Sequence, residues 1–236
     1  MSGGYGQFCP VAMASEILAK RWTLVLLREF VAGSTRFNEL RRGVPRMSPT
    51  LLSRRLKELE AAGILRRVAY AAGPGPDEYG LTEAGLALAP VIEAIGTWGQ
   101  AWVATDVSLA NPDPALLMWD MRRNLDPDPM PDGRKVVRFG YPDQPASSRD
   151  WWLIVEPDGG VDLCASEPGF DVDLYVTSDL RVMVSIWMGL STVSREIDAG
   201  RRHLDGPAPM RNRMQAWLGL SHFAGLPKRR GASVRP

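Results

Sequence analysis

The sequence predicts an α+β protein of two successive units in a chain of 236 residues. In residues 1–104, apolar residues recur at helical spacing, and two short extended runs follow the first helices. Residues 105–114, TDVSLANPDP, contain two prolines and form the expected junction. Strand-like runs and then helical runs fill residues 113–225, which is typical of a C-terminal α+β domain whose antiparallel sheet is covered by helices. The length of the chain leaves room for two domains.

The first unit opens with a helix predicted over residues 13–32, whose apolar side chains recur near helical spacing. A short helix from Phe37 to Arg42 and a tight turn, Gly43-Val44-Pro45, follow. We expect these two helices to be core scaffold and to precede a third helix at a sharp angle.

The third helix is predicted from Ser48 to Ala62. Ser48 is a preferred N-cap residue, Pro49 suits the first helical position, and Gly63 is an expected helix stop. One face is an apolar stripe of Leu52, Leu56 and Leu59. The opposite face carries hydroxyls and cations but no acid: Thr50, Ser53, Arg54 and Lys57, with Pro49 and Arg55 beside them. Such a helix after a short helix and a tight turn suits the major groove of double-stranded DNA.

Positive charge is concentrated around this helix. The whole chain is close to neutral, at +1, yet residues 20–67 contain twelve Lys or Arg against four Glu. No Lys or Arg occurs in residues 1–19 or 68–121. A local excess of eight positive charges is expected where a protein contacts phosphates. The alternative is an ordinary solvated charged surface.

Two short extended runs follow, Ile64–Tyr70 and Glu78–Leu81, joined by the Gly/Pro-rich Ala71–Asp77. This pattern predicts a β-hairpin, which after a helix-turn-helix is a wing. The tip carries no cation, so its phosphate contacts would come from backbone amides or from Arg66 and Arg67 at its base. Neighbouring strand residues point to opposite faces, so at most one of these two arginines is expected to face DNA.

A further helix is predicted over residues 82–104, with Thr82 as its cap and a kink or frayed turn at Pro90. It has few charges, but its polar residues and glycines interrupt it too often for a membrane span. We expect it to form the interface of a homodimer, the alternative being packing on the C-terminal domain. A two-fold dimer places its DNA-reading helices about 34 Å apart and requires a palindromic operator. The apolar stripe consists of Leu88, Ile92, Ile95, Trp98 and Trp102.

The region from about residue 8 to residue 103 resembles the HxlR-type winged-helix transcriptional regulators. The resemblance implies a dimeric bacterial repressor or activator that contacts operator DNA through helix 48–62 and the wing. The motifs that carry it are Cys9-Pro10, KRWT at 20–23, RFNEL at 36–40, Ser48-Pro49, Leu51-Leu52-Ser53, Leu56, Leu59, Gly63 and YGLTEAG at 79–85.

In the second unit, residues 113–225, a helix is predicted at Asp113–Asn124. Ser178 is expected to cap a helix that runs to Trp187, and two more helices follow at Val193–Ala199 and Met210–Leu218. Residues 226–236 form a basic tail that we expect to be disordered. The predicted strands are Lys135–Phe139, Asp150–Val155, Val161–Ala165 and Asp171–Thr177, with a short one around His203–Asp205.

Residues 150–220 resemble the sterol-carrier-type lipid-binding domain, through Trp187-Met188-Gly189, Ile197-Asp198-Ala199-Gly200 and a final helix with Met214 and Trp217. The resemblance implies an apolar tunnel for a fatty, aromatic or sterol-like molecule. In this setting the molecule would act as an effector. Large, deformable side chains suit such a pocket; the alternative, which each Trp or Met taken singly favours, is that they fill a core. The candidate ligand-binding residues are Trp151, Trp187, Met188, Met214 and Trp217.

The sequence shows no pattern typical of catalysis. The two histidines, His203 and His222, lack the context of a metal site, and no P-loop, GxGxxG or GxSxG motif follows a strand. We therefore expect no enzyme activity, no cofactor and no metal.

The two cysteines are Cys9 and Cys164, and the start MSGGYGQF has no apolar signal-like region. We expect a cytoplasmic protein without a structural disulfide or a membrane association. Cys9 occupies the Cys-Pro position of the HxlR resemblance, where some members sense oxidants, and is a redox candidate. The alternative is a small buried residue that closes the first helix on the dimer.

These observations favour a dimeric DNA-binding transcriptional regulator that reads a palindromic operator with helix 48–62 and responds to a hydrophobic small molecule. Two alternatives are a lipid or hydrophobic-metabolite binding protein whose winged helix serves mainly for dimerisation, and an enzyme that uses a C-terminal cleft. We predict that Thr50, Ser53 and Arg54 approach base edges from a helix that begins at Ser48 and Pro49. Arg36, Asn38, Arg55 and Lys57 are predicted to contact phosphates.

Overall fold

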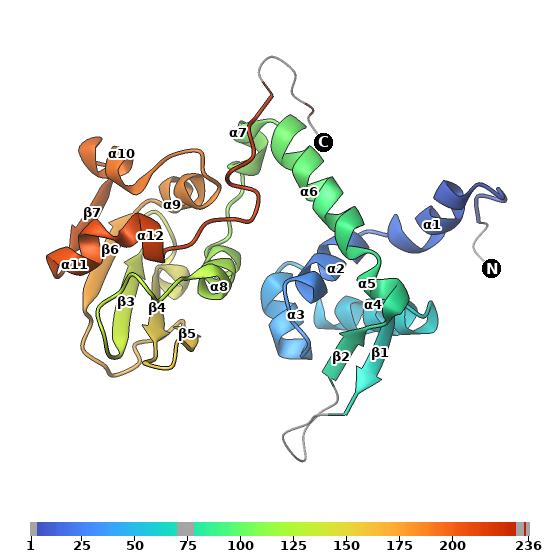
Figure 1. The fold of residues 1–236 in the computed structure, drawn as a ribbon, viewed down its shortest axis with the longest axis horizontal. Coiled ribbons are helices and arrows are strands. Elements are labelled where there is room, and N and C mark those ends of the chain that lie inside the picture. Colours follow the sequence, from blue (N-terminus) through green and yellow to red (C-terminus); the bar gives the residue numbers. More distant parts are fainter. Residues whose placement is uncertain (1–3, 70–77, 230–233, 235–236) are drawn as a thin grey trace. The chain divides into compact units, whose positions relative to one another are not determined.

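The structure, a computed structural model, describes residues 4–69, 78–229 and Val234. The chain divides into two compact units, Met1–Gly96 and Thr97–Pro236 (Figure 1). The division falls within helix α6 (Ala89–Trp102). Among the described residues, no helix has the length and apolar character needed to cross a bilayer.

The first unit begins with α1 (Pro10–Leu18) and α2 (Thr23–Val31), where the sequence predicted one helix over residues 13–32. That prediction was wrong at Trp22, whose φ of 77° is left-handed. A residue in this conformation cannot continue a right-handed helix. The turn therefore starts a new helix in a different direction. Further along the unit come α3 (Phe37–Gly43) and α4 (Pro49–Ala61).

The ends of α4 confirm the predicted cap and stop. The Ser48 hydroxyl accepts a hydrogen bond from the Leu51 amide at 3.3 Å, and Pro49 occupies the first helical position. Gly63, with φ of 72°, directly follows the C-cap residue Ala62. Both ends of the helix are thus set by local chemistry.

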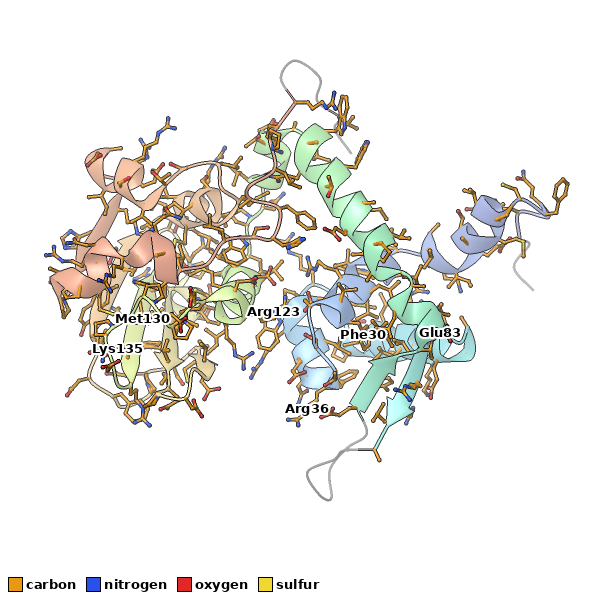
Figure 2. All side chains as sticks on the ribbon, viewed as in Figure 1. Phe30, Arg36, Glu83, Arg123, Met130 and Lys135 are labelled. Atoms are coloured by element: carbon orange, nitrogen blue, oxygen red, sulfur yellow. The ribbon has the colours of Figure 1, made fainter. Side chains whose placement is uncertain are left out.

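One apolar cluster holds α2, α3 and α4 together, and Figure 2 shows Phe30 within it. Burying such a stripe is what fixes an amphipathic helix in place. The predicted stripe of α4 is confirmed, because its three leucines are at most 2% exposed. The buried cluster includes Leu26, Leu27, Phe30, Leu40, Val44, Leu52, Leu56 and Leu59.

The predicted hairpin is confirmed as β1 (Leu65–Val68) paired antiparallel with β2 (Glu78–Leu81). The predicted turn at Ala71–Asp77 lies outside the described residues. The amide of Tyr79 donates to the carbonyl of Thr35 at 2.8 Å, which ties β2 to the segment that precedes α3.

The region predicted as one helix over residues 82–104 forms α5 (Glu83–Leu86) and α6. Thr82 caps α5 as predicted, with its hydroxyl accepting from the Gly85 amide at 3.2 Å. Pro90 lies in the first turn of α6, where no helical hydrogen bond requires an amide hydrogen. The proline therefore begins a new helix instead of only kinking an existing one.

The second unit contains a five-stranded sheet in the order β5-β4-β3-β6-β7. The prediction of an antiparallel sheet was wrong for one pair, because β3 and β6 are parallel. After the edge strand β5, the chain crosses back over residues 165–173 and enters beside β3, so β6 runs in the direction of β3. The strands are β3 (Lys135–Gly140), β4 (Asp150–Val155), β5 (Val161–Cys164), β6 (Leu174–Ser178) and β7 (Arg202–Asp205).

One face of this sheet and the surrounding helices share a large buried cluster, as predicted for a sheet covered by helices (Figure 1). The opposite face carries a small cluster of Val136, Trp152 and Ile154, so Trp151 and Trp152 point to different sides. The helical elements are α7 (Thr105–Ser108), α8 (Pro114–Asn124), the 3₁₀ turn Ala146–Ser148, α9 (Leu180–Trp187), α10 (Val193–Asp198), α11 (Ala208–Asn212) and α12 (Met214–Trp217).

Two predicted helix boundaries in the second unit differ. Helix α9 has Asp179, not Ser178, at its N-cap position, and the Leu180 amide donates to Asp143 Oδ1 at 3.0 Å. The helix start is thus stabilised by a carboxylate from a distant loop. The helix predicted over Met210–Leu218 is two short helices, α11 and α12, separated at Arg213.

Part of the basic tail has defined contacts, although we expected it to be disordered. Lys228 Nζ donates to the Val103 carbonyl at 2.8 Å, and the Arg229 amide donates to the Ala101 carbonyl at 3.0 Å. Val234 forms a parallel bridge with Val103. Residues 230–233 and 235–236 lie outside the described residues.

Candidate nucleic-acid interface

The solvent-facing side of α4 carries the residues predicted to read DNA. Ser48, Pro49 and Thr50 are exposed at its N-terminus, and Ser53 is half-buried one turn later. The exposed N-terminal turn presents the hydroxyls of Ser48 and Thr50, which suit hydrogen bonding to bases and phosphates.

Two cations continue this surface toward the C-terminus of α4. Arg54 has a side chain that is 67% exposed, with its Nε 3.7 Å from Glu58 Oε1. Lys57 is exposed, and it forms no hydrogen bond or ion pair with the residues that the structure describes. The ion pair between Arg54 and Glu58 is weak because it is exposed to solvent. Both cations therefore remain available to an anionic partner.

Arg55 does not belong to this surface. Its side chain is 9% exposed, donates to the Glu58 carboxylate and reaches the Arg21 carbonyl at 3.3 Å. The same Glu58 carboxylate lies 3.4 Å from Lys20 Nζ. The guanidinium thus connects α4 to the turn between α1 and α2, a structural position that differs from the predicted phosphate contact.

Arg36 and Asn38 lie at the start of α3, and Figure 2 labels Arg36 there. The Nε of Arg36 is 2.7 Å from Glu78 Oε1 in β2, and its side chain is 49% exposed. Asn38 is exposed. The pair between Arg36 and Glu78 joins the helix-turn-helix to the hairpin while leaving much of the guanidinium accessible.

At the base of the hairpin the two arginines differ. Arg67 Nε is 3.3 Å from Glu60 Oε1, and its guanidinium lies 5.7 Å from the centre of the Tyr79 ring. Arg66 is exposed without a hydrogen bond or ion pair to any described residue. Arg66 is thus the less engaged of the two cations; that at most one of them faces DNA stays a prediction.

A buried carboxylate, which sequence reasoning missed, supports the turn between α3 and α4. Glu29 is fully buried, and Arg28 Nη2 donates to its Oε1 at 2.6 Å and to the Gly43 carbonyl at 3.2 Å. A Cβ at Gly43 would collide with the Glu29 carboxylate. The sequence signal was an acid within an otherwise apolar helix face, followed by a glycine at the turn.

Cys9 directly precedes α1 and is exposed. Hydrogen bonds from the backbone amides of Ala12 and Val11 lower the pKa of its thiol. A lowered pKa and exposure both favour thiolate chemistry.

The predicted ligand-binding residues do come together. Trp151, Trp187, Met214 and Trp217 are buried in the main cluster of the second unit, with Met188 packed against it. The indole nitrogens of Trp151 and Trp217 donate to the carbonyls of Ser148 and Met210, each at 2.9 Å. The arrangement fits both a packed core and an apolar site that opens for a ligand.

A separate hollow of about 370 Å³ lies at one end of β3 and β4. Met130 and Lys135, labelled in Figure 2, line it together with Asp128 and Glu156. It does not include any of the predicted ligand-binding residues. Its polar lining does not suit a hydrophobic molecule.

Together, the helix-turn-helix, the hairpin and the exposed cations of α4 define a winged helix-turn-helix protein. The model of the HxlR-like helix-turn-helix family matches residues 17–107. The chain is 39% identical over 98 residues to the uncharacterized HTH-type transcriptional regulator YvaP of Bacillus subtilis (strain 168), covering 41% of this chain and 91% of that protein. With YdeP of the same organism, an uncharacterized HTH-type transcriptional regulator, it shares 37% identity over 94 residues, 40% of this chain and 73% of that protein.

The chain therefore belongs to the HxlR-like helix-turn-helix family and is a transcriptional regulator of that type. Among solved structures, that of the redox regulator HypR in its reduced form is 36% identical, with a TM-score of 0.36, over 39% of this chain and 91% of that one. The family match ends at residue 107. The five-stranded sheet of the second unit lies outside this match.

Proposed function

We propose that the chain is a dimeric transcriptional regulator that reads a palindromic operator with α4 and responds to a hydrophobic small molecule in its second unit. The observation that carries the proposal is the exposed face of α4, where hydroxyls lie at the N-terminus and two accessible cations follow. A surface of this kind matches the polyanionic groove of a duplex.

Residue roles follow from exposure. Thr50, Ser53 and Arg54 approach base edges, since they share the exposed face of the helix that enters the groove. Ser48 and Pro49 form the N-terminal turn, which lies against the sugar-phosphate backbone. Arg36, Asn38 and Lys57 contact phosphates; Arg55 is left out because its guanidinium is buried.

Exposed apolar side chains support a homodimer. Helix α1 buries none of its residues, and Val11 and Met13 are 74% and 58% exposed. In α6, Ile95 and Trp98 are 44% and 50% exposed. Large exposed apolar side chains on two helices are typical of an interface that a partner covers. A second copy of this chain would use them and would place two α4 helices one duplex turn apart.

The second unit is proposed to receive the effector. Its main cluster combines tryptophan and methionine side chains from the sheet and from four helices. An effector changes DNA binding only if its affinity differs between the DNA-competent and DNA-incompetent states of the dimer. The predicted ligand residues, including Trp187 and Met214, are therefore proposed to line a site whose packing differs between those states.

The alternative of a lipid-binding protein that uses its winged helix only to dimerise is not supported. It gives no reason for an accessible Lys57 beside Arg54 on the face of α4 that points away from the core. The named relatives are themselves described as transcriptional regulators.

The experiment is a footprint and mobility shift of the purified chain on DNA upstream of its gene. The proposal predicts two protected half-sites about 34 Å apart, and loss of the shift when one half-site is scrambled. Equal binding to the scrambled and original fragments would contradict sequence-dependent recognition.

Cys9 is proposed as a second input, an oxidant-sensitive switch, because its thiol is exposed and its pKa is lowered. Oxidant treatment should then reduce DNA binding of the parent chain and spare Cys9→Ser. If Cys9→Ser loses DNA binding to the same extent, the switch proposal fails while the regulator proposal stands.

A further inference from the structure

Three polar side chains lie in one row on the helix-covered face of the second unit's sheet. Ser178 in β6 pairs with Arg202 in β7. Strand β3 runs parallel to β6 with Gly140 beside Thr177, so the next residues, Tyr141 and Ser178, are also neighbours. Tyr141, Ser178 and Arg202 are all buried, at 0%, 4% and 4% exposure. The row therefore lies inside the unit and not on its surface.

The polar atoms of this row lack adequate partners. Arg202 Nε and Nη1 and Ser178 Oγ are buried and have no hydrogen-bond partner among the residues that the structure describes. Arg202 Nη2 donates to Met214 Sδ at 2.8 Å, and the Tyr141 hydroxyl donates to Met118 Sδ at 3.1 Å. Thioether sulfur is a weak acceptor. The row thus presents several strong donors and no anionic acceptor.

The carboxylates nearest to the row are already engaged. Glu196 accepts from Arg201 Nε at 2.6 Å and from the Ser191 hydroxyl. Asp143 accepts from the Leu180 amide at the start of α9. The charge of Glu196 is near enough to act on Arg202, but within the described part of the chain no carboxylate forms a hydrogen bond or ion pair with the Arg202 guanidinium.

Arg202 nevertheless remains charged. Burial lowers the pKa of Arg202 to about 10, which leaves the guanidinium protonated at neutral pH. Burial also raises the pKa of Tyr141, so its phenol keeps the hydrogen that it can donate. A buried cation without an anion is strongly unfavourable. Such an arrangement is expected where a charge is kept for a ligand.

We propose that Tyr141, Ser178 and Arg202 form a binding site for the carboxylate of an organic acid with an apolar body. Carboxylate oxygens accept two parallel hydrogen bonds from a guanidinium and further ones from hydroxyls. A single cation balances a single negative charge, so a monoanion fits better than a phosphate monoester with two charges.

The surroundings define the rest of the ligand. Met118, Met183, Met214 and Trp217 are fully buried in the same cluster, so the body of the acid must be apolar. The Met118 and Met214 sulfurs occupy positions that the carboxylate would take, and flexible methionine side chains can withdraw at low cost. The ligand thus replaces two weak acceptors with one strong acceptor. This inference rests on the proposed effector role of the second unit and specifies the chemical class of that effector.

The test uses the full-length protein and two pairs of probes, decanoate with decanol and phenylpropionate with phenylpropanol. Binding is measured by calorimetry and tryptophan fluorescence. At least one acid should bind roughly ten- to a hundredfold more tightly than its alcohol, because a charged hydrogen bond separates them. The proposal would be overturned if each acid bound with the same affinity as its alcohol, or if none of the four probes bound. Tighter binding of decyl phosphate than of decanoate would overturn the assignment to a carboxylate.

Amino-acid substitutions then test whether the preference for the acid over the alcohol arises from Tyr141, Ser178 and Arg202. Arg202→Met should retain the affinity of the parent for the alcohol and lose the preference for the acid. Ser178→Ala should reduce that preference severalfold, which provides a second reading if Arg202→Met does not fold. Arg211→Met, the same change at an exposed position in α11, should behave like the parent. An acid preference that persists in Arg202→Met would contradict the proposal.

Thermal unfolding separates a ligand site from a structural arginine. Without ligand, Arg202→Met should unfold at the same or a higher temperature than the parent, because it removes an unpaired buried charge. A clear drop in that temperature would assign Arg202 to structural support and overturn the ligand role. A mobility shift on operator DNA, run in parallel, reports separately on the proposed regulator: loss of acid binding with an intact shift rejects only the present inference.

Discussion

The Glu29 carboxylate lies directly against the α-carbon of Gly43, in contact with the last residue of α3. Arg28 binds both partners, through Glu29 Oε1 and the Gly43 carbonyl. The angle between α3 and α4, and therefore the presentation of α4, depends on this close approach. A buried acid and a glycine thus support the surface that we propose to meet DNA.

Gly43→Ala tests this support. The added methyl group must displace a buried carboxylate, so the free energy of unfolding should fall by about 1–3 kcal/mol. Urea unfolding measures the change. Gly99→Ala is the matched control, because nothing lies within 4 Å of a Cβ there and alanine is favoured within a helix. Equal stability of the two variants would show that Gly43 is not needed for packing.

Ser48 has two separable roles, since it caps α4 and lies on the proposed DNA-facing surface. Ser48→Asp should keep the stability of the parent within about 0.5 kcal/mol, because aspartate caps a helix as well as serine. It should weaken DNA binding, because it adds a negative charge near phosphates. Ser48→Ala should instead lose about 1 kcal/mol of stability. Tight operator binding by a stable Ser48→Asp protein would remove Ser48 from the interface.

Arg55 and Lys57 should respond in opposite ways to the same substitution. Arg55→Met removes the buried donor to Glu58 and the donor to the Arg21 carbonyl, although Lys20 and Arg54 still lie near Glu58, so it should lower the free energy of unfolding by roughly 1–3 kcal/mol. Lys57→Met should leave stability unchanged and reduce the slope of log affinity against log salt by about one. The measurements are urea unfolding and a salt titration of operator binding. A reduced salt slope in a fully stable Arg55→Met protein would restore the phosphate contact predicted from sequence.

The free energy of unfolding of the second unit should depend on pH through the ionisation of Glu196. The hydrogen bond from Arg201 and that from Ser191 hold the pKa of Glu196 below its ordinary value of 4.5, although burial opposes them. The unfolded chain therefore binds this proton more readily, and the stabilisation present above pH 4.5 is lost as the pH falls through the lowered value. Arg201→Gln should be less stable than the parent at pH 7, because it removes the guanidinium that donates to the Glu196 carboxylate. The difference should shrink as the pH falls below 4.5, and a difference that stays unchanged at acid pH would contradict this account.

Much of the winged helix could be predicted from sequence because local chemistry specifies it. Ser48, Pro49 and Gly63 define the ends of α4 through capping and left-handed geometry. Thr82 likewise starts α5. The position of Arg55 could have been predicted too, because it falls at i+3 from Leu52, within the stripe that includes Leu56.

Other features depend on contacts that are distant in sequence. The left-handed Trp22 breaks a run whose helical spacing continues through it. The start of helix α9 is fixed by a hydrogen bond that the Leu180 amide donates to Asp143, 37 residues earlier in the chain. The parallel pairing of β3 with β6 arises from the crossing of residues 165–173, which composition does not reveal. The row of Tyr141, Ser178 and Arg202 becomes visible only when the order of the strands is known.

The most direct test of DNA reading by α4 is operator affinity of the double variant Arg54→Glu, Lys57→Glu. The control is Arg181→Glu, Arg211→Glu, which changes the net charge equally at exposed positions of the second unit. The account predicts that the α4 variant loses more than tenfold in affinity while the control stays close to the parent. If the α4 variant holds the operator as tightly as the parent protein, α4 does not read DNA.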